Sequence, residues 1–302
     1  MSKLKTTLHL IKTPGKMVIP LAEKGVFNWM PDEQYLKLVY RGVFGKKLDL
    51  DDPKTFNEKL QWLKLHDRNP AYHQMVDKYD AKEYVAEMIG EEYVIPTLGV
   101  WDSAEEIPFE ELPDQFVLKC THDSGSIVIC QDRAHFDETE ARNKLKKAMQ
   151  KSIFWFGREW PYKGLKARII AEPYLEDHSV GELRDYKFFC FNGKVKCFKV
   201  DFDRFINHGA NYYDAEGNYL EIGEVVCPPN PGKRILLPKN LNKMTELAEK
   251  LSEGYPFLRV DFYDVDGKIY FGELTLFPAS GLSKFTYTGN DELLGTWLKL
   301  PE

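Results

Sequence analysis

The sequence has 302 residues and a formal net charge of −6, and 43% of its residues are hydrophobic. This length and apolar content predict a folded protein with a substantial core and two or three sub-domains. The acidic balance argues against a nucleic-acid-binding protein, which normally carries a basic domain or stripe.

The cysteines and the apolar runs indicate the cellular setting. The 5 cysteines form no Cys-x-x-Cys pair, which favours reduced thiols in a cytoplasmic protein. The lysine-interspersed segment 1–20 lacks the pattern of an export signal, and no stretch approaches the ~20 apolar residues that span a bilayer. We therefore expect neither export nor an integral membrane anchor.

Residues 1–75 are predicted to be mainly helical. One helix would open at residues 31–33 and stop at Gly42. Another would cover residues 56–65, whose apolar side chains recur at a helical spacing and are explained by packing. The sequence assigns no chemistry to three polar residues of this second helix, Asn57, Lys59 and Lys64.

From Asp77 onward, helices and strands alternate. A helix over residues 78–89 would be followed by a strand at 93–99. Two further strands, at 115–120 and 127–130, would be joined by a polar Gly/Ser loop.

Two features of this pair of strands suit an anionic ligand. Ser124, Gly125 and Ser126 in the loop can present backbone N–H groups to phosphates, although such a stretch is more often only a hairpin turn. The loop matches neither the P-loop spacing nor the dinucleotide fingerprint. Lys119 is the more informative feature, because an unpaired ammonium inside an apolar strand is costly.

Residues 154–175 contain two candidates for a nucleotide-base site. The aromatic cluster 154–162 could stack a base or a sugar, although core packing or a lid is the commoner use. The strand at 168–175 breaks at Pro173. A strand end freed by proline can read an adenine edge, with Glu172 accepting a hydrogen bond from the amino group.

A clear hairpin over residues 183–200 turns at Asn192-Gly193. Lys187 lies among its apolar residues, as Lys119 does in its own strand. The following Asp201-Phe202-Asp203 matches the Asp-x-Asp pattern of nucleotide-sugar glycosyltransferases, although three-residue patterns arise by chance.

The stretch around which the chain is organised is a hairpin over residues 258–275, with an Asp-Gly turn. Regular alternation places Phe271, Glu273 and Thr275 on one face of the return strand, so that Asp261 of the first strand can face a carboxylate across the ladder. Two carboxylates beside an arginine can hold Mg²⁺ against a polyphosphate. A surface hairpin with solvated charges is the alternative.

The candidate residues form an ordered series along the chain: Lys78, Lys119 with its Gly/Ser loop, Glu172-Pro173-Tyr174-Leu175, Lys187, Arg259-Val260-Asp261 and Glu273. This series resembles the ATP-grasp superfamily. The runs 55–64, 67–70 and 77–79 resemble its TupA-like branch, which is associated with teichuronopeptide and other surface-polysaccharide biosynthesis. The likeness covers roughly residues 50–285, and order, spacing and local structure agree over that length.

The resemblance implies an α+β ATP-grasp fold, in which two α+β lobes clamp ATP and a mainly helical extension precedes them. The expected division is 1–75 for the helical region, 76–170 for the small lobe with the preceding α/β segment, and 171–302 for the large lobe with the metal site.

The resemblance also implies an ATP- and Mg²⁺-dependent ligase. A carboxylate would attack the γ-phosphate of ATP, and an amine would then displace phosphate from the acylphosphate to give an amide. The expected partners are a glycan or small-molecule carboxylate and an amine such as an amino acid, in cell-surface polysaccharide biosynthesis. No nucleic acid is expected, whereas a peripheral contact with a lipid-linked glycan is compatible with the sequence.

Carried over by position, Arg259 would stabilise the oxyanion of the tetrahedral intermediate and Lys187 would act on the acceptor side. Asp261 and Glu273 would hold Mg²⁺, with the weaker Thr275 hydroxyl standing where many relatives have an asparagine. The residues implied to bind ATP are Lys78 and Lys119 at the phosphates, Ser124, Gly125 and Ser126 closing over them, and Glu172, Tyr174 and Leu175 around the adenine.

Three other functions stay open at this point. A glycosyltransferase would hold a metal and a nucleotide-sugar with Asp201 and Asp203, and would lose nucleotide-sugar binding when either aspartate is replaced. An ATP-grasp phosphotransferase would release ADP without consuming an amine. A non-catalytic binding module would have no need of the full charged set.

Overall fold

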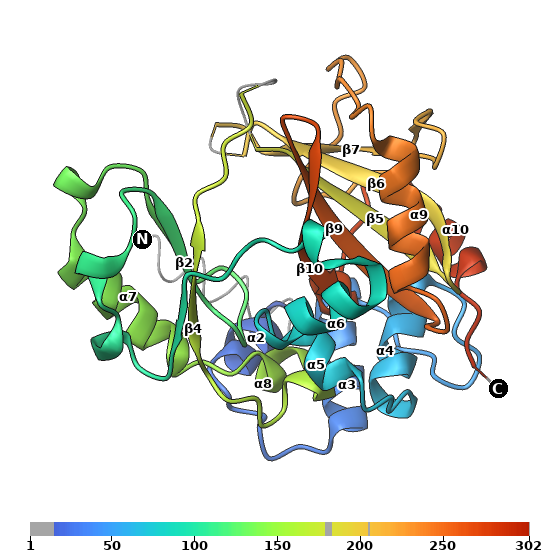
Figure 1. Cartoon of the computed structure of the whole chain (residues 1–302). Helices are drawn as coiled ribbons and strands as arrows, with labels where there is room; N and C mark the ends of the chain where they lie inside the picture. Colours follow the sequence, from blue (N-terminus) through green and yellow to red (C-terminus); the bar gives the residue numbers. More distant parts are fainter. Residues whose placement is uncertain (1–14, 179–182, 205, 302) are drawn as a thin grey trace, which may run out of the picture.

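Figure 1 shows the computed structural model, which describes residues 15–178, 183–204 and 206–301. Two antiparallel sheets stand side by side, and the helices of the N-terminal region lie across the bottom of the view. This arrangement is the α+β class expected from the sequence. Within the described residues, no helix combines the length and the apolar character needed to cross a membrane.

The first described part of the chain is helical, as expected. α3 runs past the predicted stop at Gly42, because the left-handed residue that ends it is Gly45 (φ 72°). α4 begins at a capping box, in which Thr55 accepts from the backbone N–H of Glu58. The helices of this part are α2 (Gly15–Glu23), α3 (Asp32–Phe44), α4 (Phe56–His66), α5 (Tyr72–Val76) and α6 (Asp80–Ile89).

The smaller sheet has the strand order β1-β4-β2-β3, and helix α7 (Glu138–Met149) covers one of its faces. Leu118 and Leu145 are fully buried between them. The strand predicted at 93–99 begins only at Gly99, because Pro96 has no N–H for a ladder. The strands are β1 (Gly99–Trp101), β2 (Phe116–Cys120), β3 (Ile127–Cys130) and β4 (Ile169–Pro173).

The larger sheet has the order β10-β9-β5-β6-β7-β8. Helix α9 (Leu241–Leu251) covers one face, where the Cys190 thiol lies 3.6 Å from the Ala248 carbonyl oxygen. The β5–β6 turn falls at Asn192-Gly193, as predicted, and both residues have positive φ. The strands are β5 (Asp185–Phe191), β6 (Lys194–Phe202), β7 (Gly209–Tyr213), β8 (Tyr219–Leu220), β9 (Phe257–Val265) and β10 (Lys268–Thr275).

Two further helices tie the parts together. α8 (Ile153–Gly157) lies near α2, and α10 (Asn290–Trp297) packs on α4. β4, which belongs to the smaller sheet, crosses the boundary expected at residue 170, and the division into lobes stays a prediction.

A β-bulge decides which residues of β10 share a face. Phe271 pairs with Phe262, whereas Glu273 pairs with Asp261, so Gly272 is an extra residue in β10. The prediction from regular alternation, which put Phe271 on the face of Glu273, was therefore wrong. Phe271 instead joins the apolar core, and the bulge turns Glu273 to the opposite face.

Candidate functional site

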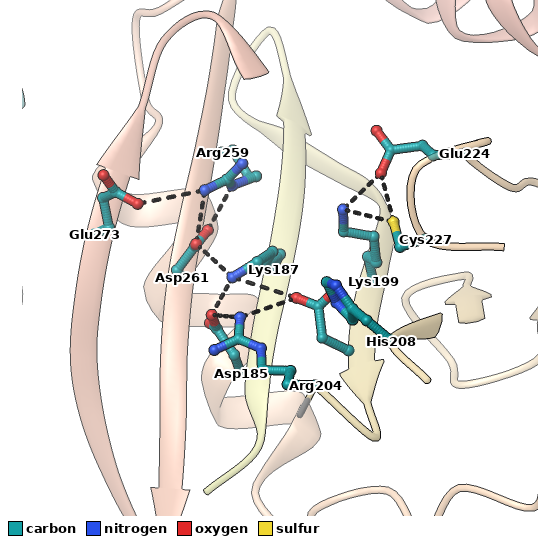
Figure 2. A network of polar contacts seen from close by, with 11 residues as sticks. Asp185, Lys187, Lys199, Arg204, His208, Glu224, Cys227, Arg259, Asp261 and Glu273 are labelled. Carbon is teal, nitrogen blue, oxygen red and sulfur yellow. Dashed lines mark hydrogen bonds and ion pairs between the residues drawn. The ribbon is translucent and has the colours of Figure 1, made fainter. Parts of the chain in front are cut away.

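Charged side chains form a row across the face of the larger sheet that α9 leaves open. The register places Glu273 of β10 beside Asp261 of β9, and Asp261 beside Lys187 of β5. Lys187 in turn pairs with Lys199 of β6. Because directly opposed residues of antiparallel strands point to the same face, these side chains share one face of the sheet. Figure 2 shows Lys187 in contact with Asp261, and Lys199 in contact with Glu224 and Cys227.

Asp261 lies between two cations. Arg259 donates from Nε to Oδ1 (2.7 Å) and from Nη2 to Oδ2 (2.8 Å), and Lys187 donates to Oδ2 (2.9 Å). The Nη2 atom of Arg259 also lies 3.5 Å from Oε2 of Glu273. Burial raises the pKa of Asp261, but Arg259 and Lys187 outweigh it and hold that pKa below its ordinary value. Asp261 is therefore ionised at neutral pH.

Lys187 lies among three aspartates, although only 8% of it is exposed. It donates to Asp185 and Asp261, and its Nζ atom lies 3.6 Å from Oδ2 of Asp201. Burial lowers the pKa of Lys187, but Asp185 and Asp261 raise it above its usual value. Lys187 therefore stays charged, and the sequence prediction missed Asp185, whose only signal was a charge two residues before Lys187.

Asp185, at the start of β5, and Asp201, near the end of β6, extend this network to the ends of these two central strands. Arg204 donates to Asp185 (2.7 Å) and lies 3.2 Å from Asp201, while Nε2 of His208 lies 3.0 Å from Oδ1 of Asp201. The side chains of Arg204 and His208 are 39% and 42% exposed. The network therefore runs from the buried carboxylates to solvent.

The Asp-x-Asp pattern does not form a metal pair. Asp203 contacts Lys233 (2.5 Å), whereas Asp201 contacts Arg204 and Lys187. In the part of the chain that the structure describes, no three His, Cys, Asp or Glu side chains gather into a ready metal site. The glycosyltransferase hypothesis thus gains no support from the geometry.

The end of β10 offers ligands that fit Mg²⁺ only together with a phosphate. Asp261 and Glu273 supply carboxylates at paired positions, and Thr275 follows on the same face. The Oγ1 atom of Thr275 is buried and has no hydrogen-bond partner among the described residues. Because an unsatisfied buried hydroxyl costs free energy, this set fits a cation whose remaining ligands are phosphate oxygens and water.

The smaller sheet carries a second charged centre. Glu172 of β4 contacts Lys119 of β2 (2.6 Å) and Lys82 of α6 (2.5 Å). Burial raises the pKa of Glu172, but the two lysines outweigh it and hold that pKa below its ordinary value. Lys119 thus has the charged partner that its position required, whereas Lys82 was missed because a lysine on a helix gives no sign of a distant partner.

Two isoleucines extend this centre with an apolar wall. Ile127 and Ile129 are 45% and 46% exposed on β3, although their strand neighbours Val128 and Cys130 are buried. Ile127 pairs with Lys119, so the isoleucines lie on the face of the sheet that carries the charged centre. Exposed apolar side chains beside polar groups are typical of a pocket for an organic ligand.

Lys78 is tied to the Gly/Ser loop. Its ammonium donates to the backbone carbonyl of Asp123, and the side chain of Ser126 donates to the Asp123 carboxylate. Ser124 and Gly125 are exposed, and Gly125 has φ 90°. The loop borders a pocket of about 360 Å³, which also reaches α7. Tyr174 and Leu175 directly follow the end of β4, next to Glu172, and are half-buried.

The aromatic cluster 154–162 is divided between the core and the site. Phe154 is only 3% exposed and packs inside the protein. Burial raises the pKa of Tyr162 well above its usual value, and the nearby carboxylates of Glu159 and Glu273 act in the same direction. Tyr162, which packs against the core of the larger sheet, therefore stays a neutral phenol.

A family model described as TupA-like ATPgrasp matches residues 58–299. The chain belongs to the TupA-like ATP-grasp family. This match spans every candidate residue from Lys78 to Thr275. It confirms the family and the ATP-grasp fold that the sequence predicted.

Solved structures of ATP-grasp ligases resemble this TupA-like chain at low identity. D-alanine–D-alanine ligase from Bacillus anthracis, complexed with ATP, is 16% identical over 67% of this chain and 54% of its own (TM-score 0.39). The Helicobacter pylori ligase is 14% identical over 81% and 69% (TM-score 0.43). The ATP-grasp ligase PsnB, complexed with a precursor variant, Mg and ADP, is 11% identical over 84% and 64% (TM-score 0.42).

The chain thus spans about half the length of the first of these ligases. A search of curated proteins found no match.

Proposed function

We propose that this TupA-like ATP-grasp protein is an ATP- and Mg²⁺-dependent ligase that joins a carboxylate to an amine through an acylphosphate. The observation that carries the proposal is the end of the β9–β10 hairpin. There Asp261, Glu273 and the unpartnered Thr275 hydroxyl lie together, beside the guanidinium of Arg259. Phosphoryl transfer depends mainly on such placement and neutralisation of charge.

On the larger sheet, Asp261, Glu273 and Thr275 would hold the Mg²⁺, which supplies charge neutralisation to the phosphates when bound. Arg259 carries a fixed charge that can stabilise an oxyanion on the substrate. Lys187 keeps its charge among the aspartates and is our candidate for the acceptor side, since the network leads from it to the partly exposed Arg204 and His208.

At the smaller sheet, Lys119 of β2 and Lys78, in the turn before α6, would contact the phosphates. Lys78 and Lys119 are each held by an oxygen, the Asp123 carbonyl and the Glu172 carboxylate respectively, which a triphosphate can replace. Exposed Ser124 and Gly125, with Ser126 beside them, form the loop that closes over these phosphates. Glu172 and the backbone of Tyr174 and Leu175 would hold the adenine, with Ile127 and Ile129 as its apolar wall.

For the substrates, we propose an amino acid or another amine and a carboxylate on a sugar acid or glycan precursor, used in the cytoplasm for cell-surface polysaccharide. This proposal rests on the TupA-like family, whose branch is associated with surface polysaccharides. A lipid-linked glycan would need only a peripheral contact. A phosphotransferase with the same ATP site would differ in one respect, because it would release ADP without forming an amide.

The test is thermal stabilisation by ATP with Mg²⁺, compared with a panel of UDP-sugars. A ligand that binds the native state raises its stability by RT ln(1 + [L]/Kd). We expect Mg·ATP to stabilise the wild type and to stabilise Glu273→Gln less, while the exposed-surface control Glu253→Gln behaves as wild type. Stabilisation by a UDP-sugar alone, unchanged in Glu273→Gln, would refute the proposal.

A positive result leads to the second measurement. Pairs of amines and sugar acids are then screened for ADP release, and the products are examined for an amide by mass spectrometry. ADP released without any amide would favour the phosphotransferase.

A further inference from the structure

Three polar residues of α4 form a buried ladder to the turn that follows β10. Asn57, Gln61 and Lys64 recur at the spacing of one helix face, and each is at most 1% exposed. All three donate to oxygen atoms of residues 280–283. Because buried polar groups are costly unless they are paired, this face of α4 is built for that turn.

The contacts are numerous and complementary. Asn57 donates to the carbonyl of Ser283 (3.0 Å) and accepts from its N–H (3.0 Å). Gln61 donates to the carbonyls of Ser280 (3.0 Å) and Gly281 (2.7 Å). Lys64 donates to the Ser280 carbonyl (2.7 Å) and to the Ser280 hydroxyl (3.0 Å). Of residues 280–283, all except Leu282 are therefore hydrogen-bonded to side chains of α4.

The turn needs this support because its backbone is strained. It forms a short 3-10 segment, η6 (Pro278–Gly281), in which Ala279 and Ser280 have φ of 47° and 56°. Residues with a side chain rarely adopt this left-handed region, and they persist there only when their surroundings hold them. The segment begins three residues after Thr275, so it continues the strand that carries the candidate metal ligands.

We propose that Asn57, Gln61 and Lys64 are positioning residues, which hold η6 in its left-handed form just beyond the strand that carries Glu273 and Thr275. This inference rests on the proposed function and assigns a role to the polar face of α4, whose Asn57 and Lys64 had no predicted chemistry. The ladder fixes the Ser280 hydroxyl, five residues after Thr275, and in this proposal the turn serves to align the second substrate. Loosening η6 misaligns the reacting groups and leaves nucleotide binding, which uses other residues, unchanged.

Lys59 supplies a matched control. It lies on the same helix and makes the same kind of contact, donating to the carbonyls of Gly295 (2.8 Å) and Leu298 (2.6 Å), away from η6. Lys64→Met and Lys59→Met therefore each remove one lysine that holds α4 to a neighbouring segment. Lys64 is the more buried of the two and also donates to the carbonyl of Gly157 (2.7 Å), so Gln61→Met, which removes contacts only to the turn and to Lys64, is measured beside it. Should Lys64→Met fail to fold, Gln61→Met gives the same comparison.

The first readout is hydrogen exchange at the backbone amides of Ser280 and Leu282, which donate to carbonyls within the turn. In the full-length protein, exchange should become at least about tenfold faster in Lys64→Met and should not change in Lys59→Met. Adding Ala279→Gly to Lys64→Met should restore the protection, because glycine adopts the left-handed region without strain. Equal exchange in the two lysine variants would overturn the proposal.

The second readout is ADP formation from Mg·ATP with the amine and carboxylate found by the screen above. Lys64→Met should lower kcat at least about tenfold with the KM for ATP unchanged, whereas Lys59→Met should keep both. A loosened η6 with unchanged kcat would overturn the positioning role. If the wild type neither binds nor uses Mg·ATP, the proposed function fails, and the exchange comparison still decides whether α4 holds the turn.

Discussion

Replacing Glu172 with glutamine should destabilise the protein and strengthen its response to polyanions. The Glu172 carboxylate is the shared partner of Lys82 and Lys119, and the three side chains are 5%, 11% and 15% exposed. Glutamine keeps the shape but removes the charge, which leaves two ammonium groups together with little water. Removing one partner of a buried ion pair typically costs about 3–5 kcal/mol, and we expect a loss of that order.

A more exposed pair supplies the control. Glu249 contacts Lys194 (2.7 Å), whose side chain is 69% exposed, so Glu249→Gln should cost about 1 kcal/mol or less. Both variants would be measured by thermal unfolding with circular dichroism. Since 1 kcal/mol shifts the Tm of a domain of 150–250 residues by about 2–4 °C, a loss of about 3–5 kcal/mol should make Glu172→Gln melt roughly 6–20 °C below the wild type.

The anion response is measured in the same assay. Tripolyphosphate without Mg²⁺ should raise the Tm of Glu172→Gln more than that of the wild type, because the two ammonium groups no longer have a carboxylate partner. The reasoning is refuted if Glu172→Gln has the same Tm as Glu249→Gln. It is also refuted if tripolyphosphate raises the Tm of the wild type and of Glu172→Gln by the same amount.

Three further predictions concern the larger sheet. Thr275→Val should keep or slightly raise stability in urea, because it removes a buried hydroxyl without a partner, yet should weaken stabilisation by Mg·ATP; a clear loss of stability would contradict this. Asp261→Asn should cost about 3–5 kcal/mol in urea unfolding, because Arg259 and Lys187 lose a shared partner, and should abolish the Mg·ATP shift. The folded-state pKa of Asp261 is lowered, so its contribution is present above the ordinary pKa of about 3.9 and is lost as pH falls through the lowered value. Below about pH 4, the wild type should therefore lose stability faster than Asp261→Asn, and parallel pH profiles would count against the ion pairs.

Features with a local signal could be predicted from the sequence. The Asn192-Gly193 turn depends on two adjacent residues that tolerate positive φ, and it lies where expected. Lys119 was singled out because a lysine in an apolar strand needs a partner, and Glu172 provides one. The metal, nucleotide and catalytic roles of the site residues stay predictions, since they concern ligands.

The features that were missed depend on contacts between distant segments. Lys82 reaches Glu172 of the smaller sheet only because of where the fold places α6, which itself packs against α9 and β10 of the larger sheet's core. Gln61 and Lys64 look like ordinary polar residues of a helix until the fold brings η6 against them. A helical or alternating pattern reports which face of an element is buried, but it does not name the partner that a polar residue will meet.

The extra residue at Gly272 also affects how this hairpin is compared with those of relatives. A gapless alignment to a regular hairpin keeps the residue count but reverses the faces beyond Gly272, so it matches Glu273 to a residue that points into the core. A relative without the insertion would carry the equivalent carboxylate one position nearer its turn. In a comparison with such a hairpin, the residue equivalent to Glu273 is the one that lies across from Asp261, and the alignment needs a one-residue gap at 272.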